Sequence, residues 1–164
     1  MNMNGKRISY LGLLLAAALI IGYIESLLPP LSGIPGVKLG LSNIVTLITM
    51  RLFGNKEAFI VLILRIILSG LLFGNLFGII FSLSGGLSAF AAMWAADQSK
   101  RFSLIGISVF GGVTHNVGQL AAAVLIVKQP GLVYYAPVLL ISGLICGLLT
   151  GFAAKLILNR LRLI

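Results

Sequence analysis

Three polar side chains stand close together in an otherwise apolar stretch, and their types suit the binding of a small polar molecule. His115 and Gln119 are four residues apart and Asn116 and Gln119 are three apart, so a helix would make them neighbours on one side. Imidazole and carboxamide groups both donate and accept hydrogen bonds. The alternative is a hydrogen-bond network between helices, in which one bond contributes only about 0.6 kcal/mol in a membrane. The density of polar groups favours a ligand site, and the alternative stays open.

Further polar residues are expected at a similar depth on other elements. Glu25 lies near the end of the first apolar stretch, and Lys38 lies in a loop rich in proline and glycine that could close over a site. Because polar groups are costly against lipid and need partners, we predict one pocket in the outer half of the protein. Its predicted substrate-binding residues are Glu25, Lys38, Asn43, Ser84, His115, Asn116 and Gln119. Lys38 would suit an anionic or polar-headed ligand.

Other kinds of chemistry lack the residues that they need. The chain has one histidine and one cysteine, Cys146, which are too few for a metal site with three protein ligands. Its acidic residues Glu25, Glu57 and Asp97 are far apart, whereas an enzyme that binds magnesium diphosphate needs clustered aspartates. The sequence has no GxxxxGK[ST] loop to bind ATP. We therefore expect no catalytic residue, no cofactor and no metal, and we do not expect an enzyme.

The stretches that carry these residues are long enough to cross a membrane. Hydrophobic residues make up 59% of the 164 residues and charged ones only 9%, and one span needs about 20 apolar residues. We predict an all-α polytopic membrane protein with a single integral membrane domain, residues 1–164. Its six transmembrane helices are expected at about 8–28, 39–53, 58–73, 76–96, 102–127 and 133–158. The run from 66 to 94 is divided near Phe73-Gly74-Asn75 because it is too long for one helix.

The basic residues predict how these helices are oriented. Nine of the 12 lysines and arginines fall on one side of the six-helix arrangement, and only Lys38 and Lys128 fall on the other. Because cytoplasmic loops are enriched in basic residues, we expect both termini in the cytoplasm of a multi-pass protein of the cell membrane. The net charge of +9 therefore reflects topology. Nucleic acid is not an expected partner, because a nucleic-acid reader needs a basic face on a soluble fold.

Arg65 is the one basic residue that falls inside a predicted span, in its middle or inner half. An ionisable group at that depth needs a partner or a watery cavity. Three roles stay open from the sequence. The guanidinium could contact a backbone carbonyl near the break at residue 74, bind an anionic ligand, or extend toward the inner surface.

Rows of small residues predict where helices approach one another closely. Glycines recur every four residues in the last span, at Gly143, Gly147 and Gly151, a pattern that brings helix backbones together. The first span has two rows of small residues, one at Ala18 and Gly22 and one at Gly12 and Ala16. One row is enough to pack a helix inside the bundle, so we interpret these four residues as a docking face for another membrane protein. Internal packing is the alternative.

Several strings of the sequence resemble one protein family. They are GYIESLLPP at residues 22–30, PGVKLGLSNIVT at 35–46, FSLSGG at 81–86 and GGVTHNVGQ at 111–119. Their spread makes the resemblance cover nearly the whole chain. The chain resembles the Gx transporter family, whose bacterial members are often labelled heptaprenyl diphosphate synthase component I. That family is similar to the substrate-binding S components of energy-coupling-factor (ECF) transporters.

The resemblance implies a fold and a function. It implies the S-component fold of six helices with cytoplasmic termini, an outer first loop that acts as a lid, and a first helix that docks on a transmembrane coupling subunit. It further implies a solute-binding subunit of the bacterial plasma membrane that captures a small vitamin- or cofactor-like molecule from outside, with ATPases supplied by partners. The alternative is a non-catalytic accessory or scaffold subunit linked to prenyl-quinone or flavin redox metabolism.

Overall fold

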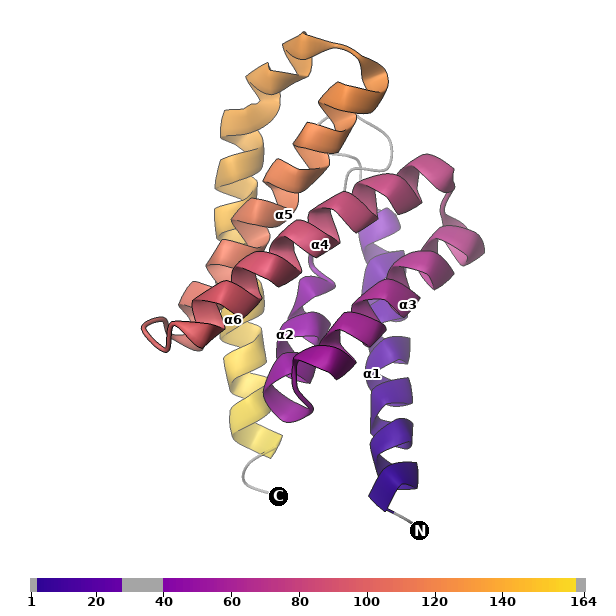
Figure 1. Cartoon of the computed structure of the whole chain (residues 1–164), viewed down its shortest axis with the longest axis vertical. Helices are drawn as coiled ribbons and strands as arrows, with labels where there is room; N and C mark the ends of the chain where they lie inside the picture. The colour runs from indigo at the N-terminus through magenta and orange to yellow at the C-terminus, as the bar shows by residue number, and fades with distance from the viewer. Residues whose placement is uncertain (1–2, 28–39, 162–164) are drawn as a thin grey trace.

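The computed structural model describes residues 3–27 and 40–161, and every regular element in these two ranges is helical. In chain order the elements are α1 (Met3–Ser26), α2 (Asn43–Leu52), α3 (Asn55–Phe73), α4 (Leu76–Gln98), α5 (Leu104–Val127), the 3₁₀ helix η1 (Pro130–Tyr135) and α6 (Ala136–Leu161). Figure 1 shows a bundle in which α5 and α6 run side by side while α3 and α4 cross it obliquely. The all-α fold that the sequence predicts is confirmed for the described residues.

Four helical stretches are long and apolar enough to cross a membrane: Gly5–Ser26, Leu76–Gln98, Leu104–Val127 and Pro130–Leu161. α3 has a sufficient length of 19 residues but carries Lys56, Glu57 and Arg65. α2 has only 10 residues, which extend about 15 Å and so cover about half of the hydrocarbon core of a bilayer. These helices support a membrane protein, and the count of six spans stays a prediction.

Two helix boundaries follow from local signals in the sequence. The break predicted near residue 74 is confirmed, because α3 ends at Phe73 and α4 begins at Leu76. Asn75 precedes α4, and its side chain accepts a hydrogen bond from the N–H of Gly78 at 2.8 Å, which satisfies one of the donors that a helix start leaves unpaired. α2 begins later than the predicted span, since Gly40 has a φ of 82° that no α-helical residue adopts.

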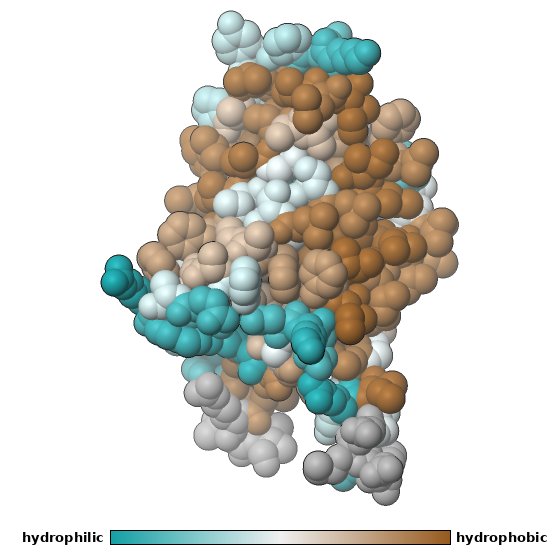
Figure 2. All heavy atoms as spheres, viewed as in Figure 1, coloured by the Kyte–Doolittle hydropathy of each residue, from teal (hydrophilic) through white to brown (hydrophobic). Residues whose placement is uncertain are grey.

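The bundle has a broad apolar middle and two polar ends. Figure 2 shows a hydrophobic band between them, with a hydrophilic belt at the lower end, where α4 joins α5. α1 begins and α6 ends toward this same lower end (Figure 1), as an even number of crossings requires. Ion pairs join helices here: Arg7 of α1 contacts Glu57 of α3, and Arg51 of α2 lies 2.9 Å from Asp97 of α4. The cytoplasmic orientation of this end stays a prediction.

α2 is short, but it lies inside the bundle. Seven of its 10 residues are buried, and its Leu47 joins Met93 of α4 and Ile107 of α5 in a core where each is 1% exposed. A helix surrounded in this way places its first residues within the protein instead of at its surface. The polar start of α2, at Ser42 and Asn43, is therefore buried as well.

α5 and α6 approach each other through glycine. A Cβ atom placed on Gly147 of α6 would lie 2.7 Å from the Cα atom of Val109 in α5. Positions without a side chain let two backbones meet directly, which is how helices associate where lipid supplies no hydrophobic driving force. Ser108 and Thr150 add a hydrogen bond of 2.9 Å between the same two helices.

Candidate functional site

The carboxylate of Glu25 contacts the backbone just before α2 begins. Glu25 lies near the end of α1 and is 4% exposed. Its Oε1 atom accepts hydrogen bonds from the backbone N–H groups of Gly40 and Leu41, the second at 3.2 Å. A carboxylate bonded to backbone donors in this way is charge-assisted and directional. It fastens the end of α1 to the start of α2, 15 residues away in sequence.

Arg65 of α3 reaches the same region. It is 6% exposed, and its guanidinium donates hydrogen bonds to the hydroxyl of Ser42 and, at 3.1 Å, to Oδ1 of Asn43. The charge of Glu25 also acts on this guanidinium. These partners are side chains at the start of α2, so Arg65 does not bond to the backbone near residue 74, one of the roles left open by the sequence. Binding of an anionic ligand by Arg65 stays a prediction. A buried arginine and a buried carboxylate thus both contact the short segment at the start of α2.

His115 and Gln119 of α5 complete this arrangement. They are 2% and 0% exposed. A Cβ atom placed on Gly40 would lie 2.9 Å from Cδ2 of His115 and 3.0 Å from Nδ2 of Asn43, so the start of α2 touches the imidazole ring. The other side of the ring faces α4, where a Cβ atom on Gly85 would lie 2.9 Å from its Cε1 atom and 2.7 Å from Cγ of Gln119.

We call this set the polar cluster, and it consists of Glu25, Ser42, Asn43, Arg65, His115 and Gln119. Helices α1, α3 and α5 and the start of α2 each contribute to it. Four of its members belong to the predicted site. Sequence reasoning missed Ser42 and left the role of Arg65 open. Two features of the sequence could have indicated these contacts. An arginine in an apolar span needs hydrogen-bond acceptors, and the neighbouring serine and asparagine at 42 and 43 could supply them.

Two predicted site residues make contacts of a different kind. The amide of Asn116 points to α6, where it donates to the carbonyl oxygen of Leu139 at 2.7 Å and to the hydroxyl of Ser142 at 3.0 Å. The hydroxyl of Ser84 in α4 donates to the carbonyl oxygen of Gly118 at 2.6 Å. These are bonds between helices, the alternative that the sequence left open. Lys38, the remaining predicted residue, lies outside the described residues.

The acidic side chains occupy three separate places. Glu25 belongs to the polar cluster, Glu57 contacts Arg7, and Asp97 contacts Arg51. Within residues 3–27 and 40–161, no group of three histidine, cysteine or carboxylate side chains is assembled that could hold a metal ion.

The small residues of the first helix divide between two environments. Ala18 is 1% exposed and packs against Val45 of α2 and Val61 of α3. Gly12 and Ala16 are exposed on the outside of the bundle, and nothing approaches within 4 Å of a Cβ atom placed on Gly12. Gly22 is buried, although nothing lies within 4 Å of a Cβ atom placed on it. Ala18 therefore contributes internal packing in the isolated chain, and the outward part of the predicted docking face is Gly12 with Ala16.

The long apolar helices and the polar cluster buried among them are features of a helical membrane protein. A family model described as heptaprenyl diphosphate synthase component I matches residues 14–157. The chain belongs to this family, and the match includes every described residue of the polar cluster. No curated protein and no solved structure matches the chain.

Proposed function

We propose that the protein is a membrane-embedded solute-binding subunit that captures a small vitamin- or cofactor-like molecule from outside the bacterial plasma membrane. The observation that carries this proposal is the polar cluster. A glutamate, an arginine, a histidine and a glutamine are all at least nine-tenths buried in one place. Burial of charge is costly, and apolar side chains would pack a bundle as well or better. A ligand-binding role accounts for keeping these groups inside the protein.

The connection between Glu25 and the start of α2 supports the same proposal. Glu25 lies near the end of α1, and its carboxylate binds the N–H groups of Gly40 and Leu41, which directly follow residues 28–39 in sequence. In the proposed mechanism this segment, which includes Lys38, covers the ligand in the outer half of the protein. Closure of a loop over a bound molecule excludes water and strengthens the polar contacts inside.

Energy for transport would come from partners. In this proposal a transmembrane coupling subunit binds the protein and ATPases drive it, as in the ECF transporters whose S components are similar to the Gx transporter family. The exposed positions Gly12 and Ala16 on α1 supply a surface on which another helix could approach closely.

A second candidate function is a non-catalytic accessory or scaffold subunit linked to prenyl-quinone or flavin redox metabolism. The contacts of Asn116 and Ser84 favour it, because both side chains donate hydrogen bonds to backbone carbonyl groups of neighbouring helices. The family description as one component of a synthase is also compatible with an accessory role. In this function the polar cluster would stabilise the bundle and bind no solute.

Replacement of Gln119 by leucine separates these functions. We expect the wild-type protein, gently purified, to retain a small molecule in native mass spectrometry. Gln119→Leu should lower that retention by about tenfold or more, since a lost hydrogen bond that leaves a buried partner unsatisfied costs about 1–3 kcal/mol. Gln129→Leu is the matched control, because Gln129 is exposed beyond the end of α5. Wild-type protein that carries no small molecule under these conditions would contradict the solute-binding function and favour the scaffold.

The docking face is tested by Ala16→Leu. This exposed position on α1 should tolerate leucine in the isolated chain, so the melting temperature should stay near that of the wild type. Association with a co-expressed coupling subunit should weaken by about tenfold, because overpacking a close contact costs about 1–3 kcal/mol. Co-purification yields and affinities in detergent measure this effect. Ala91→Leu, at an exposed position of α4, is the control, and equal binding by both variants would exclude this face.

A further inference from the structure

A cavity of about 340 Å³ opens at the polar end of the bundle where α4 joins α5, and none of its lining residues belongs to the polar cluster. It lies between the end of α2, the start of α5 and the end of α6. Its volume falls within the range of small-molecule sites, about 300–1,000 Å³. Its charged lining residues, Arg51 and Lys155, are both basic. This cavity is therefore electropositive where it meets solvent.

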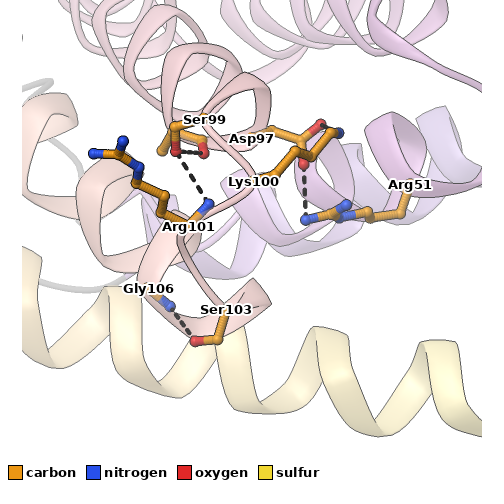
Figure 3. Close-up of polar contacts among 8 residues, drawn as sticks. Arg51, Asp97, Ser99, Lys100, Arg101, Ser103 and Gly106 are labelled. Carbon is orange, nitrogen blue, oxygen red and sulfur yellow. Dashed lines mark hydrogen bonds and ion pairs between the residues drawn. The ribbon is translucent and has the colours of Figure 1, made fainter.

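One acidic side chain lies close by and orients part of the lining. Figure 3 shows Arg51 and Lys100 directed toward Asp97, while Arg101 points the opposite way. The carboxylate of Asp97 lies 2.9 Å from Arg51 and 3.8 Å from Lys100, so one negative charge is shared by two cations. Lys155 has no ion-pair partner within residues 3–27 and 40–161. The positive charge at the cavity exceeds the negative charge that the neighbouring side chains supply.

The backbone at the start of α5 adds donors to the same wall. The hydroxyl of Ser103 accepts the N–H of Gly106 at 3.2 Å, as drawn in Figure 3. Leu104 and Ile105 line the cavity, and as the first two residues of α5 their N–H groups have no carbonyl partner within the helix. Backbone donors and cationic side chains together bind anions well, and phosphate in particular.

The rest of the lining is apolar. Leu52 and Leu158 form part of the wall, and Leu52 is 44% exposed at the end of α2. Phe102 and Leu161, at the adjoining helix ends, are 44% and 47% exposed. A ligand with an anionic head and an apolar chain would match both parts of this surface. Basic pockets between helices at a membrane surface are suited to anionic lipid head groups.

We propose that this cavity binds the phosphate head group of an anionic phospholipid, held by Arg51, Lys155 and the first turn of α5. The chemistry that it recognises is a phosphate group, which a lipid or a soluble phosphate compound could supply. The site shares no residue with the polar cluster, so this proposal does not depend on solute binding.

Titration of the purified full-length chain with phosphatidylglycerol and phosphatidylcholine, followed by native mass spectrometry, tests the site. Phosphatidylglycerol should bind more tightly. Lys155→Gln should weaken that binding about fivefold, the factor for about 1 kcal/mol per basic residue near an anionic membrane surface. Lys56→Gln is the matched control, because it removes the same charge from an exposed position of α3 outside the cavity lining. Its affinity should stay within about twofold of the wild type, well inside that 1 kcal/mol effect.

A second variant tests the cavity without a change of charge. Asn159→Trp, at an exposed lining residue, should fill the space and weaken phosphatidylglycerol binding while the melting temperature is kept. Displacement of the lipid by millimolar inorganic phosphate would show that the site also accepts free phosphate, whereas resistance to displacement would identify the lipid as the ligand. Equal losses for Lys155→Gln and Lys56→Gln, unchanged binding by Asn159→Trp, or the absence of any preference for phosphatidylglycerol would overturn the proposal.

Discussion

Arg65→Met is expected to destabilise the protein by about 3 kcal/mol or more, the magnitude typical when one partner of a buried ionic arrangement is removed. The methionine cannot donate to Ser42 or Asn43, which then lose a partner inside the protein. It also removes the positive charge that acts on the buried carboxylate of Glu25. The melting temperature in detergent should fall by roughly 6–12 °C, since about 2–4 °C corresponds to 1 kcal/mol in a chain of this size.

The control for this variant is Lys56→Met. Lys56 lies on the same helix, α3, and the substitution changes the charge in the same way, but the side chain is exposed. Its melting temperature should stay close to that of the wild type. Combining Arg65→Met with Glu25→Gln should restore part of the lost stability, because the carboxylate charge is removed together with the cation. If the Arg65→Met variant alone had the melting temperature of the wild type, the polar cluster would not be what holds α1, α2 and α3 together.

Gly147→Leu is expected to separate α6 from α5 and prevent the bundle from forming. Even the first side-chain carbon would lie 2.7 Å from Cα of Val109 and 2.9 Å from the carbonyl oxygen of Ser108. Both are backbone atoms of a packed helix, so they cannot turn aside as the end of a flexible side chain would. The cost should reach or exceed about 3 kcal/mol, the upper end of the usual range for overpacked positions.

Gly12→Leu is the matched control for Gly147→Leu, because it places the same side chain at a helical glycine with nothing within 4 Å of its Cβ position. Size-exclusion chromatography in detergent should give a single sharp peak for Gly12→Leu. Gly147→Leu should give aggregate or no recoverable protein. A well-folded Gly147→Leu protein would show that α5 and α6 do not need their backbones in contact.

The class of protein and most of its helices could be predicted from the sequence. The separation of α3 from α4 depends on a Gly-Asn pair and on a run too long for one helix, and both are properties of neighbouring residues. α2 was harder to delimit. Its 10 residues are apolar because they lie in the core, so hydrophobicity alone does not distinguish it from a full membrane span.

Only the tertiary structure decided which polar residues meet. His115 and Asn116 are adjacent in sequence and formed one predicted cluster, yet successive residues of a helix point about 100° apart. His115 consequently faces Gly40 and Gly85, whereas Asn116 binds Leu139 of α6. Two such steps, about 200° in total, separate Ala16, which is exposed, from Ala18, which is buried against α2 and α3.

The sequence by itself determined the membrane class, the helical fold and the polar residue types available for a site. These follow from local terms, the length of apolar runs and the preferences of residues at helix ends, which add up along the chain. The meeting of Arg65 with Ser42 and Asn43 required the tertiary structure. Such a contact joins residues more than 20 positions apart, and its geometry depends on how α2 is enclosed by the helices around it.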